Sequence, residues 1–488
     1  MLNDSNKKKG IVFSFLMIFI VVMVLSNCPI DKDDCDDSFT TTIIDDTTTT
    51  TNNYSTTTTI GITTTTTNNY STTTTIDITT TTTTNNYSTT TTIDITTTTT
   101  NNYSTTTTID ITTTTTTNND ITTTTIDDIT ITTITKITGG DYYTLMIDSS
   151  GNLWAWGRNN YGQLGNGNRN NQRSPVKIAN ETIFTTIAAG ENHSLAIDDN
   201  GTLWAWGNNG YGQLGDGTGI SFSAYKSSPV KIEEGTKFIT ASGGLYHSLA
   251  IDDNGTLWAW GYNNYGQLGD GTTTNQIVPI KIEEGKKFIA VACGRVHSLA
   301  IDDNGNLWTW GHNNYGQLGD GTGGVWDDYK SSPIKITDGT KFIAIALGYY
   351  YNLAIDRYGN LWGWGRNDFG QLGDGTKIDR YSPTKITDGT RFIAIAGGYY
   401  HSLAIDKDGN LWTWGNNAEG QLGDGTNTHR YYPAKIADGT KFIAVAAGLY
   451  HSLAIDDNDN LWVWGYNNYG QLGDGTTANV TTPKKIFP

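Results

Sequence analysis

Residues 244–272 read GLYHSLAIDDNGTLWAWGYNNYGQLGDGT, and close copies of this stretch recur to the C-terminus. Each copy has two tryptophans two residues apart, followed by Gly-Gln-Leu-Gly, and successive pairs lie 50 or 54 residues apart. The pairs are Trp154/Trp156, Trp204/Trp206, Trp258/Trp260, Trp308/Trp310, Trp362/Trp364, Trp412/Trp414 and Trp462/Trp464. Strand-rich repetition at this period indicates a propeller or another closed array.

Each repeat carries the signals of β-strands. Apolar and polar residues alternate in residues 246–252 and again in residues 257–261, which predicts two strands. Asn254-Gly255 between them predicts a tight hairpin, because such turns need positive φ at their central positions. The two tryptophans of a pair share one face of their strand, and we expect them to fill the gaps between neighbouring blades.

A second hairpin precedes the first one in the repeat. A Pro-x-Lys-Ile run and a Phe-Ile-Ala run are joined by a turn such as Asp338-Gly339. We therefore predict four strands per blade, in the order Pro-x-Lys-Ile, Phe-Ile-Ala, His-Ser-Leu-Ala-Ile and Trp-x-Trp, with Gly-Gln-Leu-Gly crossing to the next blade. No Pro-x-Lys-Ile run precedes residues 134–140, whereas residues 483–486 form such a run with no Phe-Ile-Ala run after it. We expect residues 483–486 to complete the first blade and close the ring, with residues 129–131 as the alternative.

Residues 1–28 have the pattern of an export signal. Lys7, Lys8 and Lys9 precede an apolar run of fifteen residues. A membrane-spanning helix needs about 20, so we expect a signal peptide, with a retained anchor helix as the alternative. The segment ending at Cys28 resembles the bacterial lipobox, although Asn27 departs from the usual small residue. This resemblance implies lipidation of Cys28 and anchoring at the cell envelope or cell surface; the alternative is simple secretion.

Residues 29–128 are threonine tracts punctuated by Asn-Asn-Tyr-Ser and Ile-Asp-Ile. Low hydrophobicity and low complexity predict a disordered spacer. Between Asp31 and Asp128 there are thirteen aspartates and one lysine, which account for most of the chain's net charge of -17. The repeats, in residues 129–488, are only mildly acidic, and they lack the basic surface that nucleic-acid binding requires.

The combination of Gly-x-x-His-Ser-Leu-Ala-Ile, Trp-x-Trp-Gly and Gly-Gln-Leu-Gly resembles the repeats of the regulator of chromosome condensation family over residues 134–488. The resemblance implies an all-β fold, a seven-bladed β-propeller of four-stranded blades. The eukaryotic namesake implies nucleotide exchange on a small GTPase and chromatin binding. This chain has no basic tail, and its longest inserts between repeats add only four residues. The similarity to secreted bacterial members implies protein binding instead.

Recurring polar residues are candidates for metal or catalytic chemistry. One histidine position recurs in five repeats: His193, His247, His297, His401 and His451. Tyr143 and Tyr351 replace it in the other two. A hydrogen-bond tether tolerates either ring and a metal site does not, so we expect structural histidines. Single aspartates in Gly-Asp-Gly-Thr suit turns better than calcium. With no nucleophile beside a base and no phosphate-cradling loop, we expect no enzyme activity, no metal and no cofactor.

Aromatic residues outside the tryptophan pairs are the candidates for binding. Tyrosines that precede the histidine position either line a loop face near the central opening or cover the core below the loops. Glu191 and Arg295 break the pattern of their repeat position, and Trp326 is the single tryptophan outside the pairs. The predicted binding residues are Phe222, Tyr225, Tyr246, Arg295, Trp326, Tyr329, Tyr350, Tyr400 and Tyr450.

These features together predict a non-enzymatic protein-interaction module, exported and held at the envelope on a flexible tether. We expect a monomer that binds another protein, whose identity the sequence does not specify, and that meets the membrane only through its N-terminal lipid or anchor. One alternative is a guanine-nucleotide exchange factor for a small GTPase. Another is a carbohydrate-binding or adhesive surface module, which the tyrosine-rich loops favour.

Overall fold

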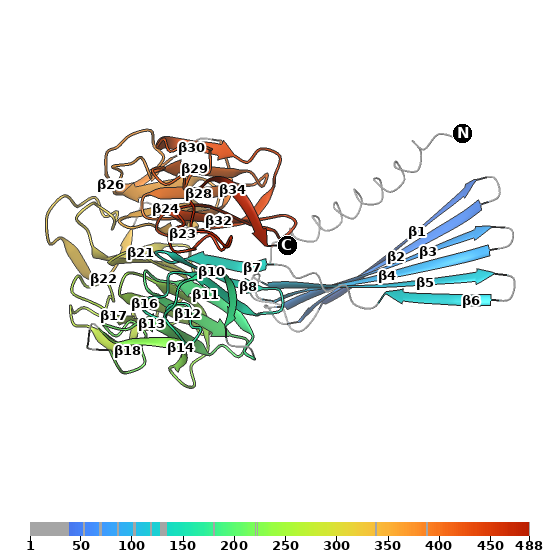
Figure 1. Ribbon diagram of the computed structural model, residues 1–488, viewed down its shortest axis with the longest axis horizontal. Coiled ribbons are helices and arrows are strands. Elements are labelled where there is room, and N and C mark those ends of the chain that lie inside the picture. Colours follow the sequence, from blue (N-terminus) through green and yellow to red (C-terminus); the bar gives the residue numbers. More distant parts are fainter. Residues whose placement is uncertain are drawn as a thin grey trace. The chain divides into compact units, whose positions relative to one another are not determined.

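The computed structural model of the protein describes residues 39–51, 54–67, 71–84, 87–100, 104–117, 120–126, 134–178, 181–219, 221, 223–336, 339–386 and 389–487. The chain divides into two compact units, Met1–Thr130 and Ile131–Pro488. The regular elements of the described residues are β-strands in both units (Figure 1), which confirms the expected all-β fold. Within these described ranges, no helix is long and apolar enough to cross a membrane. The export signal and Cys28 lie outside the described residues.

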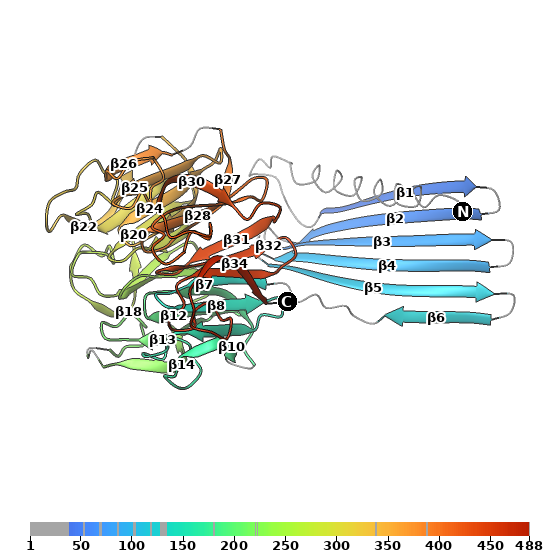
Figure 2. The ribbon, with the colours of Figure 1, turned by 45° about the horizontal axis from the view of Figure 1, so that its top comes forward.

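The first unit contains one six-stranded antiparallel sheet in chain order (Figure 2). Its strands are β1 (Phe39–Thr51), β2 (Tyr54–Thr67), β3 (Ser71–Thr84), β4 (Tyr87–Thr100), β5 (Ser104–Thr117) and β6 (Asp120–Ile126). The structure describes regular strands within the threonine-rich segment that we predict to be a spacer. The physical reason is that threonine is β-branched and favours extended backbone. The sequence repeat also places identical residues opposite one another on neighbouring strands.

The register of this sheet follows the sequence repeat. Ile76 lies opposite Ile95 and Ile93 lies opposite Ile111, so the Ile-Asp-Ile motifs align from strand to strand. The same register places Asp77 opposite Asp94. This sheet and the repeats belong to different compact units of the chain.

The second unit is a seven-bladed propeller, and each blade is a four-stranded antiparallel sheet. The innermost strands are β7 (Ile134–Gly139), β11 (Phe184–Ala189), β15 (Phe238–Gly243), β19 (Phe288–Cys293), β23 (Phe342–Leu347), β27 (Phe392–Gly397) and β31 (Phe442–Ala447). The second strands are β8 (Tyr143–Asp148), β12 (His193–Asp198), β16 (His247–Asp252), β20 (His297–Asp302), β24 (Tyr351–Asp356), β28 (His401–Asp406) and β32 (His451–Asp456). The innermost strands contact one another in a closed cycle, from β7 to β31 and back to β7.

The Trp-x-Trp and Pro-x-Lys-Ile runs form the outer half of each blade. The third strands are β9 (Leu153–Gly157), β13 (Leu203–Asn208), β17 (Leu257–Gly261), β21 (Leu307–His312), β25 (Leu361–Gly365), β29 (Leu411–Gly415) and β33 (Leu461–Gly465). The outermost strands are β10 (Gln172–Ile178), β14 (Tyr225–Ile232), β18 (Gln276–Ile282), β22 (Tyr329–Ile336), β26 (Arg380–Lys385), β30 (Arg430–Ile436) and β34 (Val480–Phe487). The predicted strands are therefore present, with the Pro-x-Lys-Ile strand last in each blade.

This order corrects the predicted closure of the ring. The strand that contains residues 483–486 is β34, and it pairs with β33 in the last blade. Blade 1 is complete without it, because β10 is its fourth strand. The prediction was wrong because Gly-Gln-Leu-Gly lies inside a blade, between its third and outermost strands. The alternative, residues 129–131, lies outside the described residues.

The second tryptophan of each pair fills the gap between blades, as predicted. Trp260 of blade 3 is fully buried among blade 2 residues that include Leu195 and Ile197. At the seam that closes the ring, Trp156 of blade 1 packs against Leu453 of blade 7 in the same way. Both seams therefore bury the same kind of apolar surface.

The Gly-Gln-Leu-Gly loop fixes each seam by hydrogen bonds to the next blade. The carbonyl oxygen of Gln213 accepts hydrogen bonds from Trp260 Nε1 at 2.9 Å and from Ser248 Oγ at 2.8 Å. At the closing seam, the carbonyl oxygen of Gln471 accepts from Trp156 Nε1 and from Thr144 Oγ1, both at 2.9 Å. The ring therefore closes through loop contacts, without an exchanged strand.

We predict that Trp260→Ala destabilises the propeller by about 3 to 5 kcal/mol, because it removes a buried ring and leaves a cavity. Trp326→Ala is the matched control: its ring is 86% exposed, so the expected change is within about 0.5 kcal/mol. Urea unfolding followed by tryptophan fluorescence measures both. Equal midpoints for the two variants would contradict this role of the buried ring.

Candidate interaction face

Two sets of loops meet at one end of the propeller. One set joins the innermost to the second strands, and the other joins the third to the outermost strands. The backbone N–H of Tyr262, in the second set, donates to the carbonyl oxygen of Tyr246, in the first, at 2.8 Å. This hydrogen bond brings the predicted tyrosines and the Gly-Gln-Leu-Gly loops onto the same face.

Tyrosines on this face stack across the seams between blades. Tyr246 lies 4.6 Å from Tyr211 of the preceding blade, between ring centroids. The equivalent distances are 5.0 Å for Tyr350 with Tyr315 and 4.9 Å for Tyr400 with Phe369. At the closing seam Tyr142 lies 5.0 Å from Tyr469. The aromatic girdle, as we name these eight rings, is thus built from pairs that join one blade to the next.

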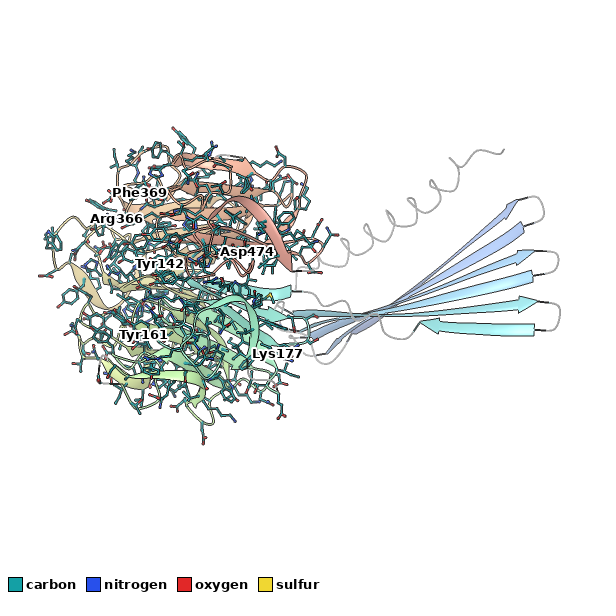
Figure 3. All side chains as sticks on the ribbon, in the orientation of Figure 1. Tyr142, Tyr161, Lys177, Arg366, Phe369 and Asp474 are labelled. Carbon is teal, nitrogen blue, oxygen red and sulfur yellow. The ribbon has the colours of Figure 1, made fainter. Side chains whose placement is uncertain are left out.

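Cations support the girdle. The guanidinium of Arg366, labelled in Figure 3, lies 4.7 Å from the Tyr315 ring centroid and 4.8 Å from that of Tyr400. It donates to the Tyr400 hydroxyl at 2.6 Å. Tyr246 and Tyr350 are half-buried, and Tyr400 is 9% exposed. The rings therefore cover the core below the loops and also border the open face. The two positions that the sequence analysis gives as alternatives for these tyrosines are combined in the same rings.

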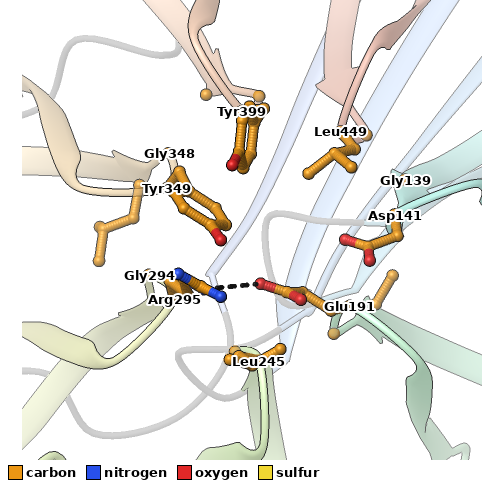
Figure 4. A pocket seen from close by; sticks show the side chains of 18 of the residues that line it. Gly139, Asp141, Glu191, Leu245, Gly294, Arg295, Gly348, Tyr349, Tyr399 and Leu449 are labelled. Atoms are coloured by element: carbon orange, nitrogen blue, oxygen red, sulfur yellow. Dashed lines mark ion pairs between the residues drawn. The ribbon is translucent and has the colours of Figure 1, made fainter. Parts of the chain in front are cut away.

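The centre of this face is a ring of seven side chains, one from each blade, which we name the channel ring. Its members are Asp141, Glu191, Leu245, Arg295, Tyr349, Tyr399 and Leu449 (Figure 4). They line a cavity of about 110 Å³ at the centre of the propeller. Near-identical blades thus present acidic, basic, aromatic and aliphatic groups at a single repeat position.

Backbone hydrogen bonds hold the channel ring in place. The N–H of Asp141 donates to the carbonyl oxygen of Glu191 at 3.2 Å, and the N–H of Leu245 donates to that of Arg295 at 3.2 Å. The N–H of Leu449 donates to the carbonyl oxygen of Asp141 at 3.2 Å, across the closing seam. These bonds position the side chains before any ligand arrives.

A glycine precedes each member of the channel ring, and the close packing of the loops requires it. A Cβ added to Gly244 would collide with the His247 ring and would lie 2.6 Å from the carbonyl oxygen of Gly294. A larger residue there would push the neighbouring loops apart.

Arg295, the basic residue of the channel ring, already contacts other side chains of the protein. Arg295 donates from Nη1 to the Tyr350 hydroxyl at 2.7 Å, and its guanidinium lies 4.3 Å from the Tyr349 ring centroid. Its ion pair with Glu191 is longer, with 3.8 Å between Nε and Oε1. Tyr349 and Tyr399 lie against each other, 3.9 Å apart between ring centroids.

Burial perturbs both carboxyl groups of the channel ring. It raises the pKa of Asp141 to about 7, against the lowering effect of Arg158 and Arg295. Burial also raises the pKa of Glu191 well above its usual value, and the neighbouring Asp141 adds to this rise while Arg295 opposes it. Asp141 is therefore mostly neutral only below about pH 7, and burial favours the neutral form of Glu191 as well.

The predicted peripheral residues lie apart from the channel ring. Trp326 is 86% exposed in the loop before β22, and Tyr329 begins that outermost strand. Tyr225 begins β14, where Arg169 lies 4.8 Å from its ring centroid. Phe222 lies outside the described residues. The structure thus brings Tyr246, Arg295, Tyr350, Tyr400 and Tyr450 to the central face and leaves the inserts on the outer strands.

The recurring histidines join neighbouring blades, as the sequence predicts. His193 Nε2 lies 2.9 Å from Ser248 Oγ of the next blade, and His451 Nε2 lies 3.1 Å from Thr144 Oγ1 across the closing seam. Burial lowers the pKa of both histidines to about 3, so they are neutral. Across the described ranges, no group of three or more His, Cys, Asp or Glu side chains could hold a metal ion.

Sequence reasoning missed most of the channel ring. Glu191 and Arg295 stood out as irregular, whereas Asp141, Tyr349 and Tyr399 did not. The signal was the variable position between the invariant glycine and the residue before the histidine. Only the loop conformation shows that this position faces the central cavity.

The fold and this face define a propeller-type protein-interaction module. A family model described as the RCC1-like domain matches residues 89–391 and 225–488. The chain therefore belongs to the RCC1-like domain family.

Three relatives illustrate the range of similarity. The ultraviolet-B receptor UVR8 of Arabidopsis thaliana is 32% identical over 249 residues, which are 51% of this chain and 56% of that receptor. The crystal structure of Prp20p from Saccharomyces cerevisiae has a TM-score of 0.61 at 25% identity, over 73% of this chain and 88% of that one. The crystal structure of human WBSCR16 has a TM-score of 0.63 at 23% identity, over 69% and 95%, and it supports the fold alone. The chain thus spans only about half the length of UVR8.

We predict that Asp141→Asn stabilises the propeller at neutral and alkaline pH. The folded-state pKa of Asp141 is about 7, above the unfolded value, so the folded protein binds more protons between about pH 4 and about pH 7 and loses stability as pH rises through that window. The substitution removes this loss. The expected gain above about pH 7 is about 1 to 2 kcal/mol, less than the full pKa shift implies, because the carboxyl borders an open cavity.

Thermal unfolding at several pH values checks this expectation, with the exposed Asp303→Asn as control. The two proteins should have equal stability below about pH 3, where Asp141 is protonated in both states. A constant difference between Asp141→Asn and the unsubstituted protein at every pH would contradict the raised pKa.

Proposed function

We propose that this protein is a non-enzymatic binding module that recognises another protein through the face that carries the channel ring and the aromatic girdle. The observation that carries the proposal is the variety of the channel ring on an otherwise repeated scaffold. Repetition explains the fold, and the residues that depart from it are free to specify a partner.

The chemistry of the face supports protein binding. Tyrosine, tryptophan and arginine dominate the binding energy of protein interfaces, and Tyr246, Tyr350 and Arg366 all lie at this end of the propeller. The hydrogen bonds and ring contacts that hold them reduce the entropy lost on association. A preorganised aromatic border around a polar centre therefore suits a partner that presents a protruding side chain.

We further propose that the propeller is displayed at the cell envelope. Support comes from the basic residues Lys7 to Lys9, the fifteen apolar residues that follow them and Cys28. The threonine-rich segment between Cys28 and the propeller would separate the module from the membrane.

Nucleotide exchange on a small GTPase is the second candidate. It is favoured by the likeness to Prp20p, a protein with binding properties toward Gsp1p and histones. That protein is only 25% identical to this one, and the mildly acidic repeats and the export pattern favour extracytoplasmic binding instead. Release of labelled GDP from a small GTPase on addition of the propeller would establish this second candidate.

Display at the envelope predicts that protease added to intact cells removes the propeller. Mass analysis should then show a lipid-modified Cys28 at the mature N-terminus. A propeller that is protected from protease and retains Met1 would contradict display at the envelope and would support nucleotide exchange.

Trp326 lies in the loop between β21 and β22, at the same end of the propeller as the channel ring. Binding at this end predicts that Trp326→Ala weakens capture of the protein partner by about tenfold or more, since an exposed tryptophan at a contact is a frequent hot spot. The control is Tyr358→Ala, an aromatic residue that is 59% exposed in the hairpin turn between β24 and β25, at the opposite end of the propeller. Quantitative affinity capture from envelope extracts compares the two. Loss with Tyr358→Ala alone would place the contact on the other face, and glycan binding lost in Trp326→Ala would support an adhesive module.

A further inference from the structure

The channel ring is electrostatically one-sided. Asp141 and Glu191 lie on adjacent blades 1 and 2, whereas the single cation, Arg295, lies on blade 4. Tyr349 and Tyr399 follow it on blades 5 and 6 (Figure 4). The ring therefore holds two carboxyl groups against one guanidinium.

Arg295 does not fully satisfy the acidic side. Its Nη1 is bonded to Tyr350 and its guanidinium stacks on Tyr349, so only the long contact of 3.8 Å reaches Glu191. Glu191 Oε1 is buried without a hydrogen-bond partner among the described residues. A buried acceptor in this state costs free energy that a donor in the cavity would recover.

The surroundings of the two carboxyl groups suit a cation that carries methylene groups. Leu245 and Leu449 offer apolar contacts on either side of the acidic pair, and the rings of Tyr349 and Tyr399 border the same cavity. Aromatic rings attract ammonium and guanidinium groups. The other titratable groups that act on the two carboxyls are Tyr142, Tyr143, Arg158, Tyr246, Arg295, Tyr349 and Tyr450.

We propose that the channel ring is a binding site for an alkylammonium or alkylguanidinium group, held by Asp141 and Glu191. The group could belong to a lysine or arginine side chain of the protein partner or to a free amine. This inference rests on the proposed function in one respect: the same face receives the partner. Binding of the cation favours the ionised carboxylates, whereas burial favours their neutral forms, so binding releases protons and strengthens as pH rises through about 7.

The test uses agmatine, which carries both an ammonium and a guanidinium group, and isothermal titration calorimetry on the full chain. Agmatine should bind, and its affinity should fall by about tenfold or more in Asp141→Asn and in Glu191→Gln, because each removes a charge partner. Asp303→Asn and Glu234→Gln, at exposed positions away from the cavity, should leave the affinity unchanged. The uncharged 1-pentanol should give no comparable binding.

A pH series adds a readout that a merely structural role would not produce. Agmatine affinity should rise between about pH 6 and about pH 8, and the binding heat should vary with the ionisation heat of the buffer. The proposal is overturned if agmatine gives no binding, if 1-pentanol binds equally well, or if neither acidic substitution changes the affinity.

A peptide with one central lysine, acetyl-Ala-Ala-Lys-Ala-Ala-amide, separates the two sources of the cation. Displacement of agmatine by this peptide supports a partner side chain, whereas agmatine binding without displacement supports a free amine. Failure of this inference is distinct from failure of the proposed function. Partner capture that depends on Trp326 while agmatine does not bind would reject the cation site alone, and the converse would reject the partner face alone.

Discussion

The structure depends on one hydrogen-bonded contact that is repeated at every seam of the propeller. A glutamine carbonyl oxygen in the Gly-Gln-Leu-Gly loop accepts a hydrogen bond from the buried tryptophan of the next blade, at 2.8 Å for Gln163 with Trp206 and at 2.8 Å for Gln421 with Trp464. The tryptophan ring fills the gap between blades, and its polar edge is satisfied at the same time. Apolar packing and loop position are therefore set by a single residue.

Because this contact also occurs between blades 7 and 1, the ring needs no exchanged strand. Trp156 and Gln471 are 315 positions apart in sequence, yet their contact has the same form as that of neighbours within the chain. A scaffold held by seven equivalent seams leaves the channel-facing loops free to vary. The channel ring varies strongly while the glycine before each of its members does not, since packing dictates the glycine.

Sequence reasoning reached the parts of the fold that periodicity encodes. The seven pairs of tryptophans predicted the blades, and the exchange of His193 for Tyr143 at one repeat position predicted a tether. The strand at which each blade begins could not be predicted, because a cyclic repeat has no unique first strand. Only the pairing partner of β34 shows where a blade ends. The channel ring could not be predicted either, since the direction in which the Asp141 side chain points depends on the loop conformation.

The central claim is that the variable loop face, and not the opposite end, binds another protein. The most direct measurement places a photo-crosslinking amino acid at Leu245, in the channel ring, or at Asp303, in the exposed hairpin turn between β20 and β21 at the opposite end. Crosslinking is then carried out in cells that express the full chain. We expect a discrete crosslinked protein from position 245 and none from position 303. Crosslinks from position 303 alone, or from neither position, would contradict this account.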